Sequence, residues 1–229
     1  MHNNHHVNTS ESGNVLLIIL LAVVLIGALS VAIQGTSNQN AHIDNETIVI
    51  RMTEAQRYAG QLERGVTFIM QNGKSESDIR FSHPDADEDY GDLDTDTDKS
   101  DQVFANEGGG VEYEFAPDGI NDGSAWEFYG NTALPEVGSD EADLVAVLPN
   151  VTFAFCEKVN AQIGNSTIPL DTATCIKGAD NTRISDANQF TSSPNITDDA
   201  SFTIKPAMNG CIQCTSGNTY HYFHVLMAR

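Results

Sequence analysis

The sequence predicts an α+β protein in which an N-terminal transmembrane helix continues into an amphipathic helix packed on a small antiparallel sheet. Three observations lead to this prediction: an uncharged apolar segment near the N-terminus, a helical stripe of apolar residues behind it, and short strand-like segments in the rest of the chain. The four cysteines add disulfides as a further stabilising feature.

The apolar segment runs from Val15 to Ile33, VLLIILLAVVLIGALSVAI, and its 19 residues carry no charge. At ~1.5 Å per residue, a helix of this length spans the ~30 Å hydrocarbon core of a bilayer. The alternative is a cleaved signal peptide, which normally has a basic start, a shorter apolar run and a small-residue cleavage site. Residues 1–13 contain no Lys or Arg, and the apolar run is longer than that of a signal peptide. We therefore predict a leader over residues 1–13 and a retained transmembrane helix over residues 14–34.

A second helix is predicted from Ile48 to Asn72-Gly73, after a linker that starts at Gly35. Apolar or small residues recur in this helix at alternating steps of four and three: Ile48, Met52, Ala55, Ala59, Leu62, Val66 and Ile69. That spacing places them on one helix face. We expect the stripe to pack on the protein's own sheet rather than in an intermolecular coiled coil. Residues 35–72 are thus predicted to be linker and amphipathic helix, and residues 73–229 to be the acidic extracytoplasmic domain.

Several segments of this domain have the composition of strands: Val111–Phe115, Trp126–Tyr129, Leu144–Leu148 and Thr219–Leu226. Val151–Ile163 is predicted to form a short helix. The polar stretch Ser166–Pro206 is predicted to be rich in loops.

The charge balance restricts the partners of the chain. The formal net charge is -21, with 32 acidic against 11 basic residues. This balance argues strongly against nucleic acid or anionic lipid as partners, because phosphate binding needs clustered Lys and Arg. Four cysteines fit an oxidising compartment, so we expect the domain on the non-cytoplasmic side of a membrane.

The acidic loop His83–Ser100 is the best candidate for metal binding. Its first carboxylates have the 1-3-5 spacing of an EF-hand calcium loop: Asp85, Asp87 and Asp89. However, Tyr90 stands where the turn-forming Gly of that motif belongs. A second ladder of alternating carboxylates follows: Asp92, Asp94, Asp96 and Asp98. Both a weak calcium site and a solvated acidic loop remain open, and no other cofactor is expected.

The cysteines and histidines suggest two further chemistries. Cys211-Ile-Gln-Cys214 has the spacing of a redox CxxC, but a polar loop follows it instead of a helix, which favours a structural role. A zinc site would use Cys211, Cys214, His221 and His224, but the two histidines lie three residues apart in a predicted strand and therefore on opposite faces. The chain has no Ser/His/Asp arrangement, nucleophile elbow or phosphate loop, so we expect no enzymatic activity.

The layout of the chain resembles that of type IV pilins and pseudopilins. A polar leader, which carries His2, His5 and His6, ends at Gly13, and the apolar helix starts at Asn14. The chain is most similar to a group of bacterial pilin-like envelope proteins in these segments: Gly13–Leu16, Gly108–Val111, Trp126–Asn131, Leu148–Val151 and Tyr220–Arg229. The resemblance implies cleavage between Gly13 and Asn14 and a single-pass inner-membrane protein with a periplasmic or extracellular C-terminal domain.

The resemblance also implies a function. It indicates a structural subunit of an envelope filament or of a secretion-associated assembly of the type II kind, with other pilin-like subunits or further copies of itself as partners through the N-terminal helix. One departure is Ile18, which stands where pilins carry a Glu that neutralises a neighbouring N-terminal amine. The alternative is a solitary membrane-anchored binding module that uses the acidic loop and calcium.

The disulfide pairing follows from the same resemblance. Cys156 and Cys211 lie in parts of the chain that resemble the group, whereas Cys175 and Cys214 are additions of this chain. The resemblance therefore implies the pairs Cys156–Cys211 and Cys175–Cys214. The nearest rival is Cys156–Cys214 with Cys175–Cys211. A Cys211–Cys214 bridge would close a very small ring and would stabilise the fold little.

Overall fold

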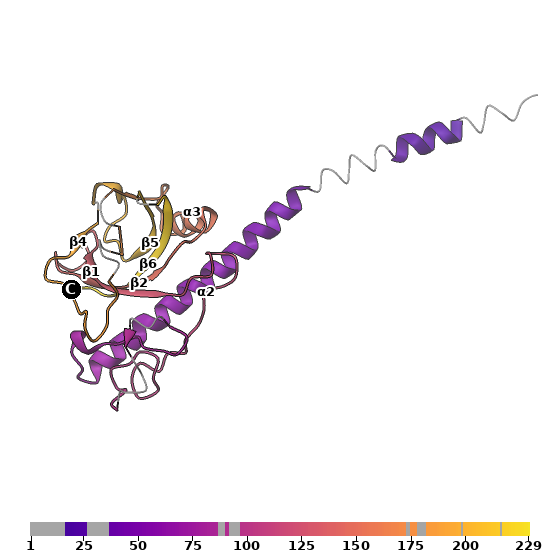
Figure 1. Cartoon of the computed structure of the whole chain (residues 1–229). Helices are drawn as coiled ribbons and strands as arrows, with labels where there is room; N and C mark the ends of the chain where they lie inside the picture. Colours follow the sequence, from indigo (N-terminus) through magenta and orange to yellow (C-terminus); the bar gives the residue numbers. More distant parts are fainter. Residues whose placement is uncertain are drawn as a thin grey trace, which may run out of the picture. The chain divides into compact units, whose positions relative to one another are not determined.

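The structure is a computed structural model that describes residues 17–26, 37–86, 90–91, 97–172, 175–177, 182–197, 199–215 and 217–229. The chain divides into two compact units, Met1–Thr47 and Ile48–Arg229. In the first unit, residues 17–26 form a helix (Figure 1). Its side chains are apolar, and the large ones are exposed. None of the described helices combines the length and the apolar character needed to cross a membrane. The predicted transmembrane helix over residues 14–34 is therefore not found, and its other residues lie outside the described ones.

Helix α2, Ser37–Gln71, contains the predicted amphipathic helix and begins earlier than the sequence indicated. Residues 37–47 were predicted to be linker, but they contain no Gly or Pro. A helix that has nucleated therefore continues through them, because each added residue contributes another hydrogen bond. The predicted end is confirmed: α2 stops before Asn72, and Gly73 follows with a φ of 90°.

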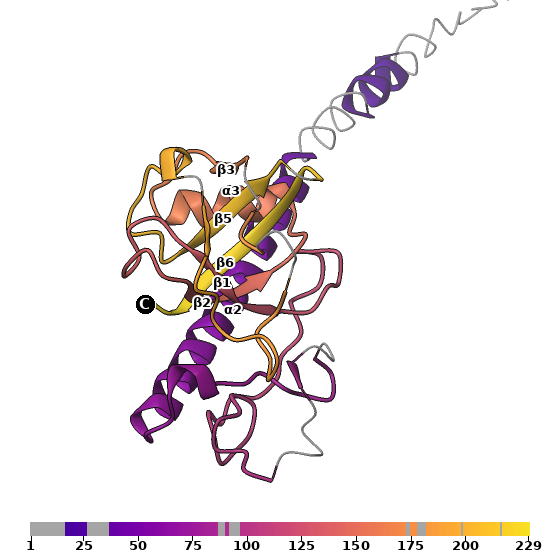
Figure 2. The same cartoon turned by 60° about the vertical axis from the view of Figure 1, so that its left-hand side comes forward.

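The apolar stripe of α2 is buried on the sheet of the same chain. From Met52 to Ile69, every residue of the stripe is no more than 5% exposed. These side chains belong to one core with Leu144, Ala146 and Leu148 of the sheet, and α2 lies along that sheet in both views (Figures 1 and 2). Packing on the protein's own sheet is thus confirmed.

The sheet has six strands in the order β3-β5-β6-β2-β1-β4. The strands are β1 Glu127–Ala133, β2 Asp143–Leu148, β3 Leu170–Asp171, β4 Asn195–Ile196, β5 Asn209–Cys214 and β6 Thr219–Met227. The four central strands pair antiparallel, whereas β3 and β4 each add a short parallel edge. The predicted α+β class with a largely antiparallel sheet is therefore confirmed.

Both faces of the sheet are covered, and every residue of β2 is buried. Helix α3, Phe153–Gln162, packs with α2 on one face, which we call the helix face. On the opposite face, Val145 and Val147 pack with Phe223 and with loop residues such as Ile176 and Phe202. We call this the loop face. The two faces alternate along each strand because successive side chains point to opposite sides.

Most predicted elements are confirmed, with two corrections. Val111–Phe115 is not a strand, because its N–H groups bond elsewhere: Val111 donates to the Val103 carbonyl and Glu114 to the Tyr58 hydroxyl of α2. Strand β5 lies in a segment that was not predicted to be a strand. Short helices η1, Glu76–Asp78, and η3, Asp199–Ser201, also occur among the described residues.

Candidate functional site around strand β5

Strand β5 carries both cysteines of the CxxC motif, and they point to opposite faces of the sheet. Cys211 belongs to the core of the helix face, where it is bonded to Cys156 of α3 with a Cα–Cα distance of 5.2 Å. Cys214 belongs to the loop face, where it is bonded to Cys175 with a Cα–Cα distance of 5.5 Å. This pairing matches the one implied by the resemblance. Because an odd spacing in a strand separates the two thiols, the motif forms no bridge within itself.

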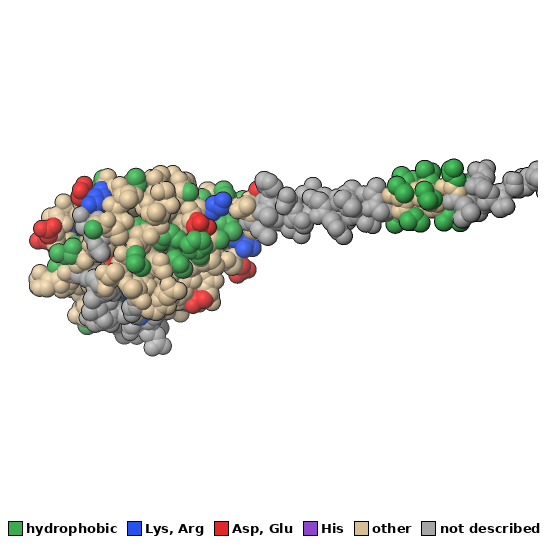
Figure 3. All heavy atoms as spheres, turned by 90° about the horizontal axis from the view of Figure 1, so that it is seen from above, with side chains coloured by type: hydrophobic (Ala, Val, Ile, Leu, Met, Phe, Trp, Pro, Cys, Tyr) green, Lys and Arg blue, Asp and Glu red, His purple; other side chains and the backbone are tan. Residues whose placement is uncertain are grey.

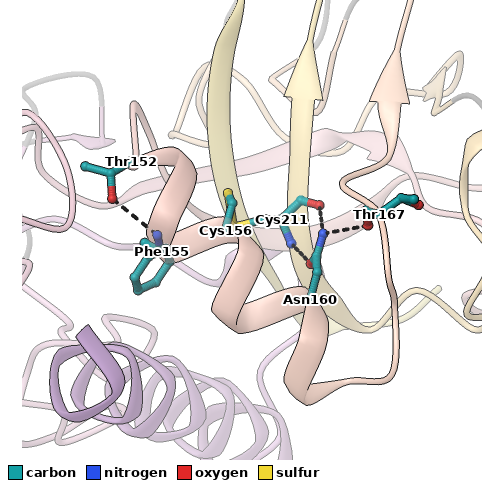
Figure 4. Close-up of a disulfide and its surroundings, with 6 residues drawn as sticks. All are labelled: Thr152, Phe155, Cys156, Asn160, Thr167 and Cys211. Carbon is teal, nitrogen blue, oxygen red and sulfur yellow. Dashed lines mark hydrogen bonds between the residues drawn. A yellow bond between two sulfur atoms is a disulfide. The ribbon is translucent and has the colours of Figure 1, made fainter. Parts of the chain in front are cut away.

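The buried side chain of Asn160 holds α3 against the peptide group of Cys211 (Figure 4). Its Oδ1 accepts from the Cys211 N–H at 2.8 Å, and its Nδ2 donates to the Cys211 carbonyl at 3.0 Å and to the Thr167 carbonyl at 3.3 Å. Strand β3 pairs with β5 only at Gln213 and Cys214. Asn160 thus takes the place of a neighbouring strand where this edge would otherwise be open.

We expect Asn160→Ala to lower the free energy of unfolding by about 3 kcal/mol, because a buried donor or acceptor left without its partner costs ~1–3 kcal/mol. The variant leaves the N–H and the carbonyl of Cys211 without that partner. Asn188→Ala is the matched control, since Asn188 is exposed and its side-chain amide makes a long 3.4 Å contact with the Ser185 hydroxyl. Urea unfolding measures both variants, and equal losses would contradict the role of Asn160.

A groove of about 720 Å³ lies beside Asn160, whose contacts with Cys211 and Thr167 we call the Asn160 brace. It is lined by Phe153, Glu157 and Lys158 of α3, by residues 164–168 and by Gln213. A smaller cavity of about 160 Å³ shares Asn160 and Asn165 with the groove. Apolar surface combined with a few charged and amide groups is typical of a site for a small ligand or a peptide.

The loop face holds a buried ion cluster centred on Glu127 of β1. Its carboxylate contacts Lys177 Nζ at 2.8 Å and Arg183 at 2.7 Å, and it accepts from the Tyr129 hydroxyl at 3.0 Å. Burial raises the pKa of Tyr129, and the charge of Glu127 adds to this. The phenol therefore stays protonated and donates to the carboxylate.

The two histidines of β6 lie on opposite faces of the sheet. His221 is buried, and its Nε2 lies 2.9 Å from the Thr219 hydroxyl. One ring nitrogen of His221 lies within 4.8 Å of the sulfurs of Cys175 and Cys214. Burial lowers the pKa of His221 to about 4, and the charge of Lys177 also lowers it, whereas the charges of Glu127 and Asp122 act against the shift. The imidazole is therefore neutral at neutral pH.

His224 lies 2.8 Å from Glu63 and so connects β6 to α2. Cys211 shares the helix face with α2, whereas Cys214 and His221 lie together on the loop face. The four-residue zinc site of Cys211, Cys214, His221 and His224 is therefore not assembled.

Most of the predicted calcium loop lies outside the described residues. Asp98 accepts from the Ser100 hydroxyl at 2.6 Å and from Lys74 Nζ at 2.9 Å, and these bonds hold the pKa of its carboxyl well below the usual range. Asp85 lies 3.7 Å from His83 Nδ1. The other predicted residues lie outside the described part of the chain: Asp87, Asp89, Asp92, Asp94, Asp96, the cleavage pair Gly13 and Asn14, and the leader histidines.

Sequence reasoning missed Asn160, Glu127 and the proximity of His221 to Cys175 and Cys214. No periodic pattern marks a buried Asn in a helix or a buried Glu at the start of a strand. The proximity of Cys214 and His221 could have been predicted from the sequence. The polar turn after Cys214 closes a hairpin in which Cys214 pairs with Thr219. His221 lies two residues further along and therefore shares the face of Cys214.

No protein-family model matches the chain, and comparisons with curated proteins and with solved structures also find no match. Function is therefore inferred from the residues and their geometry.

Proposed function

We propose that this protein is a pilin-like or pseudopilin-like structural subunit of an envelope filament or secretion-associated assembly, anchored by its N-terminal helix. The observation that carries the proposal is the extent of α2. This helix starts at Ser37, before the unit Ile48–Arg229, and buries its apolar stripe in the core of that unit. A long helix that ends inside an α+β domain suits subunits that associate through laterally packed helices.

Exposed apolar side chains support lateral packing. Val49, Ile50, Phe68 and Met70 of α2 are between 38% and 60% exposed. The helix over residues 17–26 consists only of apolar residues, and its side chains form an apolar surface in Figure 3. Burial of such surface against another subunit or in lipid is favourable by roughly 25 cal/mol per Å².

Sequence and disulfides together support the proposed location. The 19 uncharged residues from Val15 to Ile33 have the length and composition of an inner-membrane anchor. The two disulfides support a C-terminal domain on the periplasmic or extracellular side, because cytoplasmic thiols are kept reduced.

Photo-cross-linking in the native membrane tests the proposal. A benzoyl-phenylalanine residue at Ile50 or Phe68 should form adducts with a second copy of the chain or with another pilin-like subunit. The same residue at Asp140, an exposed position between β1 and β2, is the control and should form none. Adducts at all three positions, or at none, would contradict lateral packing through α2.

Processing gives an independent prediction. N-terminal sequencing of protein from native membranes should begin at Asn14, because Gly13 directly precedes the uncharged segment. An intact Met1 would contradict the prepilin interpretation, and a start beyond Ile33 would indicate an ordinary signal peptide.

The groove beside α3 favours a second candidate, a solitary membrane-anchored binding module with calcium at the acidic loop as a further ligand. Phe153 is 51% exposed at this groove. Cross-links from position 153 to one defined partner, together with none from Ile50 or Phe68, would favour the module over the structural subunit.

A further inference from the structure

We propose that Cys175, Cys214 and His221 form a zinc site when the Cys175–Cys214 disulfide is reduced. All three residues are buried, and their ligand atoms lie within 4.8 Å of one another. Among the residues that the structure describes, no other group of three His, Cys, Asp or Glu side chains meets this condition.

The geometry fits a tetrahedral ion after a small adjustment. Zn–S bonds of ~2.3 Å and Zn–N bonds of ~2.0 Å place two sulfurs about 3.8 Å apart and a sulfur and a nitrogen about 3.5 Å apart. The intact disulfide holds its sulfurs at ~2.05 Å, too close for both to bind one ion. Reduction removes this restraint, so that rotation of the two cysteine side chains completes the triangle with the imidazole.

His221 is oriented as a metal ligand. Its Nε2 lies 2.9 Å from the Thr219 hydroxyl. In the tautomer that carries the proton on Nε2, the Nε2–H donates to that oxygen and Nδ1 keeps its lone pair for a metal. Nδ1 is buried and has no hydrogen-bond partner in the described part of the chain. Buried polar atoms without partners are rare. Metal-bound histidines commonly donate their second nitrogen to a protein group, a role that Thr219 fills here.

Regular strand pairing fixes two of the three ligands. Cys214 pairs with Thr219 and Ile212 with His221, so the antiparallel β5–β6 hairpin determines the separation of Cys214 and His221. Cys175 and Cys214 belong to the apolar core of the loop face together with Ile212, Phe202 and Phe223. Such surroundings strengthen metal–thiolate attraction, because the effective dielectric constant is low there.

The chemistry requires a reductant, which we identify as a dithiol. Two thiol–disulfide exchanges transfer two electrons and two protons from the dithiol to the bridge, which yields two protein thiols and an oxidised dithiol. Zn²⁺ then displaces one proton from each thiol and binds two thiolates and the neutral imidazole, which leaves the fourth position for water. The oxidised protein therefore has no thiolate to offer, and metal binding reports the redox state.

The second disulfide provides an internal control. In the described part of the chain, no third His, Cys or carboxylate group joins Cys156 and Cys211 within the same distance. His224 contacts Glu63 on α2 instead. Reduction of Cys156–Cys211 alone should therefore create no comparable site.

Cobalt titration of the purified full chain, with a phosphine as reductant and without oxygen, tests the proposal. One equivalent of Co²⁺ should give tetrahedral visible bands and a sulfur-to-cobalt charge-transfer band, both displaced by Zn²⁺ and both absent from the oxidised chain. His221→Gln should weaken Co²⁺ binding by tenfold or more, since even outer-shell changes cost ~10–100-fold. His224→Gln is the matched control and should leave affinity unchanged.

Paired cysteine variants complete the test. Cys175→Ala with Cys214→Ala should abolish the charge-transfer band, whereas Cys156→Ala with Cys211→Ala should retain it. Equal bands from the oxidised chain, or only weak octahedral bands from surface carboxylates, would overturn the proposal. If reduction unfolds the chain and the thiols alone bind cobalt, His221→Gln and His224→Gln will behave alike, which would also overturn it.

Discussion

Glu127→Ala should lower the free energy of unfolding by about 3–5 kcal/mol, the range for removal of one partner from a buried ion pair. The side chain of Glu127 is only 10% exposed, and its two cationic partners, Lys177 and Arg183, are 20% and 14% exposed. Removal of the carboxylate leaves two poorly solvated cations without their shared anion and deprives the Tyr129 hydroxyl of its acceptor. The loss should therefore exceed that of a single neutral hydrogen bond.

Two variants separate charge from packing in this cluster. Glu127→Gln keeps the volume and one acceptor, so a loss close to that of Glu127→Ala would identify charge as the main contribution. Glu141→Ala is the matched control, because Glu141 is 68% exposed and lies 3.4 Å from Arg229. Exposed pairs contribute ~0–1 kcal/mol. Urea unfolding at constant ionic strength measures all three, and equal effects of Glu127→Ala and Glu141→Ala would contradict a buried cluster.

Periodicity explains which parts of the fold were predictable. The α2 stripe and the apolar β2 run are local patterns, and both elements were predicted within a few residues apart from the start of α2. Strand β5, NGCIQC, carries Gly and polar residues and has no such pattern. It is a strand because β6 pairs along its whole length and Asn160 covers its other edge. These contacts come from distant parts of the chain.

The same distinction applies to the candidate site. The cysteine pairing was implied by resemblance, whereas the residues around it were not predicted. Cys175, Lys177 and Arg183 lie in a loop region without regular spacing, and Glu127 lies far from them in the sequence. Their approach depends on how the loops cover the second face of the sheet. Only the placement of Cys214 and His221 on the same face of the β5–β6 hairpin follows from strand geometry.

Removal of either disulfide should destabilise the protein by about 4 kcal/mol in the chain-entropy model, because each closes a loop of several tens of residues. The sequence separations are 55 for Cys156–Cys211 and 39 for Cys175–Cys214. Since loop length enters only logarithmically, the two double Ala variants should differ by less than ~0.5 kcal/mol from entropy alone. A loss of ~4 kcal/mol is a large share of the ~5–15 kcal/mol that typically stabilises a folded protein.

The environments of the two bridges should separate the variants further. Cys156 and Cys211 lie at the brace formed by Asn160, so their replacement should also loosen α3 from β5. We therefore expect Cys156→Ala with Cys211→Ala to cost more than Cys175→Ala with Cys214→Ala, measured by urea unfolding under non-reducing conditions. Peptide mapping without reduction checks the pairing in the parent protein. A peptide with an internal Cys211–Cys214 bond would contradict it, because these thiols point to opposite faces of β5.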